Sequence, residues 1–118
     1  MKIKTTELNG EALDWAVAKC EGKVLNDEYR AYQGLIRGVW GSIRYKPSTC
    51  WAQGGPIKTR ERISTQIKHD GWWVACIYNV NDEPTHVKLD SSELVAAMRC
   101  YVASKLGDVV DVPEGVTQ

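Results

Sequence analysis

The 118-residue chain lacks the short motifs that identify most hydrolases and nucleotide-binding enzymes. The phosphate-binding pattern G-x-x-x-x-G-K-S/T and the dinucleotide-binding pattern G-x-G-x-x-G do not occur, and neither do G-x-S-x-G and H-E-x-x-H. Each pattern places reactive or phosphate-binding groups at a fixed spacing, so their absence removes the most specific routes to an enzyme assignment. We therefore expect a non-enzymatic protein with no catalytic residue and no cofactor.

The chain also lacks an excess of charge of either sign, because its 15 basic and 15 acidic side chains cancel. The overall basic field that draws many proteins to DNA or RNA is therefore missing. A local patch of Arg60, Arg62 and Lys68 remains conceivable from the sequence. Nucleic acid is nevertheless the least favoured class of ligand.

No apolar run approaches the roughly 20 residues that a membrane-spanning helix needs. The N-terminal segment MKIKTTEL also lacks the apolar stretch of a secretory signal peptide. We expect a cytoplasmic protein with no membrane partner.

The four cysteines are few and widely spaced, at Cys20, Cys50, Cys76 and Cys100. No C-x-x-C pair occurs and no histidine lies close to any of them, so the ligand spacing of a zinc site is missing. Cysteines in a cytosolic protein usually stay reduced, and within apolar patterns they behave as small hydrophobic residues. The sequence predicts buried free thiols and no metal.

Two segments have the apolar spacing of amphipathic helices. The first is ALDWAVAKC at 12–20, with Asn9 placed as an N-cap and Gly22 placed to end the helix. The second is SSELVAAMRCYVASKLG at 91–107, which begins with serines suited to capping and ends in Gly107. The sequence predicts two amphipathic helices.

Segments rich in β-branched and aromatic residues predict strands. WWVACIYNV at 72–80 is followed by turn residues and then by THVKL at 85–89, which together predict a hairpin. Shorter candidate strands occupy 2–5, 23–25 and 108–112. The region 26–41 has no clean period, and we expect a loop there with a short strand at 35–40.

The predicted fold is therefore α+β, with a small antiparallel or mixed sheet packed against two amphipathic helices. A chain of 118 residues suits one domain, so we expect a single domain over 1–118. Residues 113–118 follow the last predicted strand and are expected to fray.

The segment YKPSTCWAQGGPIKTRERI at 45–63 concentrates rings, glycines, prolines and arginines. We interpret it as a stiff loop, in which Gly54 and Gly55 bring backbone N–H groups close to a ligand. Pro47 and Pro56 would fix the chain on either side. Tyr45 and Trp51 add flat apolar faces, which suit a nucleobase.

Other side chains could complete such a site. Arg60 and Arg62 alternate, so on an extended segment they would share one side and could hold phosphate. Arg99 lies beside the apolar stripe of the last helix, where it could reach a pocket rim or extend along the surface to solvent. Trp72 and Trp73 must face opposite sides of a strand, so one of them is available for a pocket or partner.

Two alternatives stay open. Trp51 and one of the paired tryptophans could belong to the core, which would make the segment only a crowded turn. His69 beside Asp70, with His86, could instead support proton transfer in a nucleotide-processing enzyme.

Three stretches resemble the phage NinX family, a domain of lambdoid phages and prophages. They are MKIKTTELNGEALDWAVAKCEG at 1–22, YKPSTCWAQGGPI at 45–57 and LVAAMRCYVASKLGDVVDVP at 94–113. The family motifs are matched here by Tyr45, Pro47, Ser48, Trp51, Gly54, Gly55, Pro56, Ile57, Ala97, Met98, Arg99, Tyr101 and Val102. Family members have an acidic residue before the tryptophan where this chain has Cys50, so no carboxylate chemistry is expected there.

The resemblance implies a small accessory phage protein in the cytoplasm of the bacterial host. Some accessory phage proteins sequester nucleotide signals of host defence, and by analogy we expect a non-enzymatic binder of a small nucleotide-type ligand. The alternative is a module that inhibits a host enzyme, and either function could involve a homo-oligomer. The predicted ligand-binding residues are Tyr45, Ser48, Trp51, Gly54, Gly55, Arg60, Arg62, Trp73 and Arg99.

Overall fold

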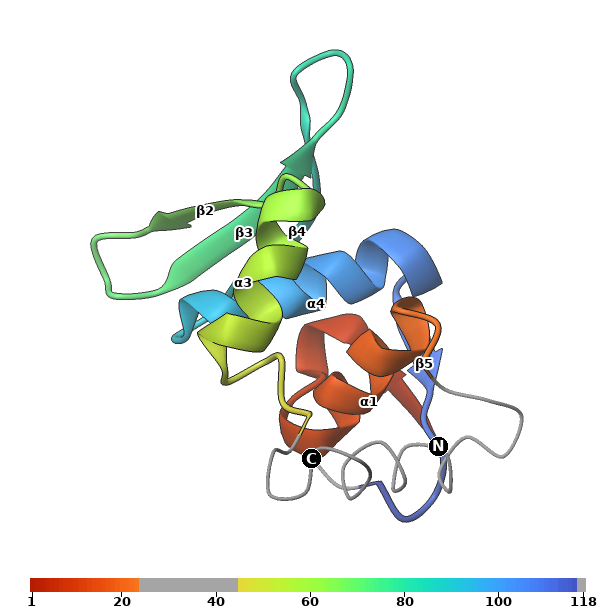
Figure 1. Cartoon of the computed structure of the whole chain (residues 1–118). Helices are drawn as coiled ribbons and strands as arrows, with labels where there is room; N and C mark the ends of the chain where they lie inside the picture. The colour runs from red at the N-terminus through yellow and green to blue at the C-terminus, as the bar shows by residue number, and fades with distance from the viewer. Residues whose placement is uncertain (24–44, 117–118) are drawn as a thin grey trace.

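The computed structural model describes residues 1–23 and 45–116 (Figure 1). Its helices are α1 (Gly10–Cys20), α3 (Trp51–Arg60) and α4 (Glu93–Leu106), with a 3-10 turn η1 (Thr5–Glu7). Its strands are β1 (Lys2–Lys4), β2 (Ser64–Ile67), β3 (Trp73–Tyr78), β4 (Pro84–Asp90) and β5 (Val109–Asp111). The predicted α+β class, both predicted helices and the β3–β4 hairpin are confirmed.

The strands form two separate antiparallel sheets rather than the one expected sheet. β2, β3 and β4 form the larger sheet in that order, whereas β1 pairs with β5. In the small sheet Ile3 lies opposite Val110, and the N-terminal ammonium of Met1 donates to the carbonyl oxygen of Val112. The two terminal segments of the described chain are therefore hydrogen-bonded to each other. They lie on the side of α4 that is opposite the larger sheet (Figure 1).

Helix α4 lies between the three-stranded sheet and α1 (Figure 1). Ten consecutive residues, 94–103, are buried, although the sequence predicts only an apolar stripe. A helix that is covered on several sides needs side chains that fit against each neighbour, and its three alanines, Ala96, Ala97 and Ala103, let other elements pack closely. Trp15, Tyr101 and Met98 are among the largest fully buried side chains of the resulting core.

The predicted helix ends are found, but only one cap uses a side chain. Ser92 Oγ accepts a hydrogen bond from the Val95 N–H, whereas the Asn9 side chain makes no capping bond. Gly107 and Gly22 have φ of +88° and +73°, the left-handed region that lets a chain leave a helix.

The predicted stiff loop at 45–63 is wrong, because residues 51–60 form helix α3. Glycine and proline disfavour helices, but packing overrides that preference here. A Cβ built on Gly54 would lie 2.2 Å from the Pro47 carbonyl oxygen and 2.8 Å from Leu94 Cδ1. Glycine therefore lets α3 approach both the preceding turn and α4.

Two further expectations concern the chain ends and the middle. The predicted frayed tail packs as far as Val116, which is buried in the core. Apart from Lys23, the strands predicted at 23–25 and 35–40 and the loop at 26–41 lie outside the described residues.

Candidate interaction surface and the predicted binding residues

Two residues that were predicted to bind the same ligand lie at opposite ends of α3. Trp51 is the first residue of the helix and Arg60 is the last. The Trp51 side chain is exposed, so the alternative that placed it in the core is wrong. Tyr45 is half-buried and packs against the core, with the Lys23 ammonium 5.6 Å from its ring centroid. Burial also raises the pKa of the Tyr45 hydroxyl.

Ser48 and Gly54 are buried rather than displayed at the surface. The Ser48 N–H donates to Asp14 Oδ1 at 2.8 Å, and the Gly54 N–H donates to the Cys50 carbonyl oxygen at 2.8 Å. The Gly54 N–H is therefore used inside the protein, contrary to the predicted ligand contact. Gly55 is half-buried, and a Cβ there would meet Trp51 Cε3 at an ordinary 3.5 Å.

Arg60 and Arg62 do not share one side of an extended segment. Arg60 is the last residue of α3, and Arg62 follows in a turn with φ of +55°. The Arg60 guanidinium contacts Glu21 at 2.6 and 3.1 Å and Glu61 at 2.8 Å. These carboxylates neutralise it, so phosphate binding would require their displacement.

Arg99 is neither at a pocket rim nor extended to solvent. Only 8% of it is exposed. Its guanidinium donates to the carbonyl oxygens of Leu8 at 2.6 Å and Leu89 at 2.8 Å, and to Asp90 Oδ1 at 3.0 Å. Arg99 thus joins α4 to the end of η1 and to β4, a structural role that its place beside the apolar stripe did not reveal.

The two adjacent tryptophans face opposite ways, as strand alternation predicts. Trp73, the one predicted to bind ligand, packs against the core. Trp72 is 47% exposed and is the available ring. Strand alternation predicted that Trp72 and Trp73 face opposite sides of the sheet, but it did not predict which of the two rings faces α4.

The two histidines lie at the surface, His69 in the β2–β3 turn and His86 in β4. Asp70 Oδ1 accepts the Trp72 N–H at 3.0 Å, which fixes the turn. The carboxylate next to His69 therefore has a structural partner.

The free thiols are less uniformly buried than expected. Cys76 and Cys100 are buried, whereas Cys20 and Cys50 are half-buried. Burial raises the pKa of Cys20 and of Cys100 to about 12. Among the residues described, no three His, Cys, Asp or Glu side chains are grouped so as to hold a metal ion.

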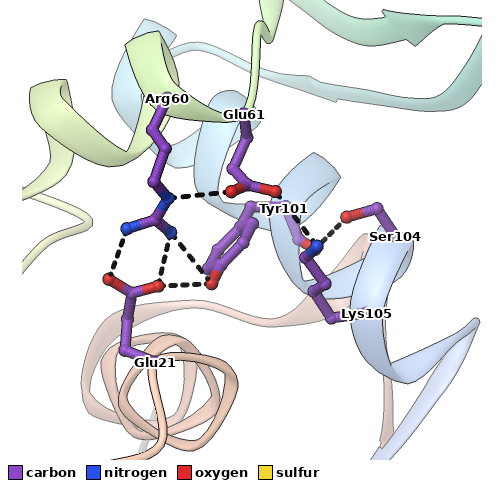
Figure 2. Close-up of polar contacts among 6 residues, drawn as sticks. All are labelled: Glu21, Arg60, Glu61, Tyr101, Ser104 and Lys105. Atoms are coloured by element: carbon purple, nitrogen blue, oxygen red, sulfur yellow. Dashed lines mark hydrogen bonds and ion pairs between the residues drawn. The ribbon is translucent and has the colours of Figure 1, made fainter.

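A polar cluster of Glu21, Arg60, Glu61, Tyr101 and Lys105 joins the ends of α1 and α3 to α4 (Figure 2). The Tyr101 hydroxyl donates to Glu21 Oε2, and the Lys105 ammonium lies 3.1 Å from Glu61 Oε1. Hydrogen bonding to Arg60 lowers the pKa of both carboxyl groups, while burial and then the bond to Glu21 raise the pKa of Tyr101. The sequence missed this cluster because its members are far apart in the chain.

The three-stranded sheet has one face toward α4 and a second that we term the outer face. Trp73, Ala75 and Ile77 belong to the core or pack against it, so the intervening residues of β3 point away from α4. Val74 pairs with Leu89, and a register shift places His86 and Val87 opposite Cys76. The apolar outer face comprises Trp72, Val74, Cys76, Tyr78, Val87 and Leu89.

Four of these side chains, Trp72, Tyr78, Val87 and Leu89, are between 45% and 51% exposed. A hollow of about 280 Å³ lies at one end of the outer face, lined by Lys68, Asp70, Trp72 and Leu89. The outer face therefore combines a broad apolar platform with a small hollow that carries one positive and one negative group.

A family model described as "Bacteriophage P22, NinX" matches residues 4–105. The chain belongs to the NinX family of phage proteins. A search of curated proteins finds no match.

In this NinX-family chain the match spans nearly every described element, from the end of β1 to α4. The outer face belongs to the matched segment, although the sequence resemblance rested on other stretches. Within residues 1–23 and 45–116, no helix is long and apolar enough to cross a membrane.

Proposed function

We propose that this NinX-family chain is a protein-interaction module that binds a protein of the bacterial host through the outer face. The observation that supports this proposal is the set of four large apolar side chains, each about half exposed, on one face of one sheet. Contiguous exposed apolar surface of this kind is typical of sites that bind other proteins. Isolated exposed apolar residues are common on protein surfaces and would not indicate a binding site.

The chemistry of the outer face suits a binding centre. Trp72 and Tyr78 are the residue types that contribute most at interfaces, because a large ring is buried with little loss of side-chain freedom. Lys68, Asp70, Asp82 and Glu83 lie in the turns at the two ends of the strands and would form a polar rim. An apolar centre with a polar rim is the usual arrangement of a protein interface.

The outer face is also held in shape before any partner arrives. Its strands are hydrogen-bonded to one another, and α4 supports the opposite face. Arg99 fastens β4 to α4 through Leu89 and Asp90. A preformed surface loses less conformational freedom on binding, which favours affinity. Binding of a host enzyme at such a surface would inhibit or redirect it, as expected of an accessory phage protein.

The test compares two exposed tryptophans on different surfaces. Tagged wild type, Trp72→Ala and Trp51→Ala are expressed in the infected host, and captured proteins are quantified by mass spectrometry. We expect one host protein to be captured by wild type and Trp51→Ala but depleted about tenfold or more with Trp72→Ala, as loss of a central ring implies. The candidate is then purified, and direct binding is measured with Leu89→Asp as a second variant. Equal capture by both tryptophan variants would reject the outer face.

A nucleotide-type ligand is the second candidate, now at the hollow rather than at α3. The Trp72 ring could stack a base and the Lys68 ammonium could contact phosphate. Thermal shifts with nucleotides and cyclic dinucleotides test it, with Trp72→Ala and Lys68→Ala as variants and Trp51→Ala as control. A shift lost in the first two variants supports it, and a flat panel at millimolar ligand rejects it.

A further inference from the structure

Strand β2 forms an edge of the three-stranded sheet, and one side of the strand is open. It pairs with β3 and packs against α4, and within the described parts of the chain no second strand pairs with it. In Figure 1 it lies at the margin of the sheet, with no described helix or strand beyond it. Ser64, Gln66 and Ile67 are exposed. An open edge presents N–H and C=O groups to which another strand can hydrogen-bond.

The ladder between β2 and β3 determines which backbone groups point to the open side. The Lys68 N–H donates to the Trp72 carbonyl oxygen at 2.7 Å, so the backbone groups of Lys68 point toward β3. In an antiparallel pair the N–H and C=O of one residue point to the same side, and that side alternates along the strand. Thr65 and Ile67 therefore each direct an N–H and a C=O away from β3. Among residues 1–23 and 45–116, these groups have no hydrogen-bond partner.

The opposite edge of the sheet, formed by β4, is less open. Arg99 on α4 donates to the Leu89 carbonyl oxygen at 2.8 Å. β4 also begins with Pro84, which has no N–H, and its pairing with β3 contains a register shift. Proline and irregular pairing are features that protect sheet edges from association. β2 contains no proline and pairs with β3 without a register shift, so β2 is the edge suited to pairing with another strand.

The open side of β2 is symmetric about Gln66. With the Lys68 bond the ladder covers residues 64–68, and Gln66 is the midpoint of this range. Across a two-fold axis at Gln66, Thr65 lies opposite Ile67 of a second copy, and the two residues exchange both N–H to C=O bonds. The two Gln66 amides, each a donor and an acceptor, then face each other. Ile67, which is 55% exposed, is covered by the second copy.

The charged residues next to the ladder favour this register over its neighbours. Arg62 and Asp70 are exposed in the turns that precede and follow β2. With the axis at Gln66, Arg62 lies opposite Asp70 of the second copy, so opposite charges meet at both ends. An axis at Thr65 would place Arg62 opposite Lys68 of the second copy, and opposed like charges destabilise a sheet. An axis one residue later would leave Arg62 without a charged residue opposite it.

We propose that β2 binds a second copy of this chain, edge to edge, in an antiparallel homodimer with its two-fold axis at Gln66. The two three-stranded sheets then form one continuous sheet. Because the axis is perpendicular to the sheet, the two outer faces lie on the same side of it. The dimer forms whatever the outer face binds, and it goes beyond the proposed function by making the protein bivalent for its partner.

Sedimentation velocity of the full chain tests whether the dimer forms. A short edge contact is expected to dissociate in the micromolar range, so the chain should pass from monomer to dimer between about 1 µM and about 1 mM. Gln66→Lys sets two ammonium groups against each other at the axis and should raise the dissociation constant about tenfold or more. Leu89→Asp, on the outer face, is the control and should leave it unchanged. A chain that is monomeric throughout would overturn the proposal, as would a dimer lost with Leu89→Asp and kept with Gln66→Lys.

Amide hydrogen exchange followed by NMR tests the pairing itself. The amides of Thr65 and Ile67 should exchange more slowly as the protein concentration rises, whereas the Gln66 amide, already bonded to β3, should not change. Protection of Thr65 and Ile67 that is independent of concentration would overturn the proposal, because the edge would then be covered within one chain. Arg62→Glu should weaken the dimer about fivefold or more and Arg62→Lys should preserve it. Equal dimerisation of these two variants would reject the register.

Discussion

Gly54 lies against the carbonyl oxygen of Pro47 so closely that a Cβ at position 54 would be only 2.2 Å from it. The same atom would be 2.8 Å from Leu94 Cδ1 on α4. Side chains never approach backbone oxygens at such a distance, so the glycine sets how closely α3 docks. Gly55, the next residue, has no such neighbour, because its Cβ would make an ordinary contact with the Trp51 ring.

The two glycines should therefore respond in opposite directions to alanine. Gly54→Ala is expected to lower the free energy of unfolding by about 1–3 kcal/mol, since overpacking against backbone outweighs the better helix propensity. Gly55→Ala should raise it by about 0.5–1 kcal/mol, because only the helix propensity changes. Urea denaturation of both variants measures the difference. Equal effects would show that the close approach at Gly54 does not hold in solution.

The same pair shows why α3 was missed in the sequence. Helix propensity counts Gly-Gly-Pro as a break, and nothing within 45–63 indicates that the chain must come this close to Pro47 and Leu94. Helices α1 and α4 were predictable because their apolar residues recur along the chain itself. The outer face was partly predictable, since alternation separates Trp72 from Trp73, but the position of α4 decides which ring is covered.

Arg99 should be among the most sensitive positions in the protein. Arg99→Met keeps much of the side-chain volume but leaves the carbonyl oxygens of Leu8 and Leu89 and the Asp90 carboxylate without their donor. We expect a loss of about 2–5 kcal/mol in the free energy of unfolding. Arg62→Met, in an exposed turn, is the control and should change it by less than about 0.5 kcal/mol. Similar losses at both positions would remove the structural role assigned to Arg99.

The thiols of Cys20 and Cys100 should react slowly. Burial raises the pKa of each to about 12, and the thiolate is the reactive form. At pH 8 each of the two thiols is therefore ionised in roughly one folded molecule in ten thousand. Alkylation with iodoacetamide, followed over time by peptide mass spectrometry, should label both far more slowly than in the same protein unfolded in urea. Labelling of folded and unfolded protein at equal rates would contradict the burial of Cys100 and the partial burial of Cys20.

The bond between Glu21 and Arg60 should make stability depend on acid pH. Hydrogen bonding to Arg60 lowers the pKa of Glu21 below its ordinary value of 4.5. A lowered folded-state pKa stabilises the fold above the unfolded-state pKa, and that contribution is lost as the pH falls through the folded-state value. The free energy of unfolding of wild type should therefore exceed that of Glu21→Gln by a constant amount above about pH 5, and the excess should shrink at lower pH.

Urea denaturation at a series of pH values from about 2.5 to about 7 measures this excess, because a carboxyl group titrates within that interval. Arg60 is half exposed, so solvent screening keeps the effect modest. Glu83→Gln in the exposed hairpin turn is the control, and it should differ little from wild type at any pH. An excess for Glu21 that persists unchanged to the lowest pH would mean that packing around Tyr101, rather than the ion pair, holds α1 to α3 and α4.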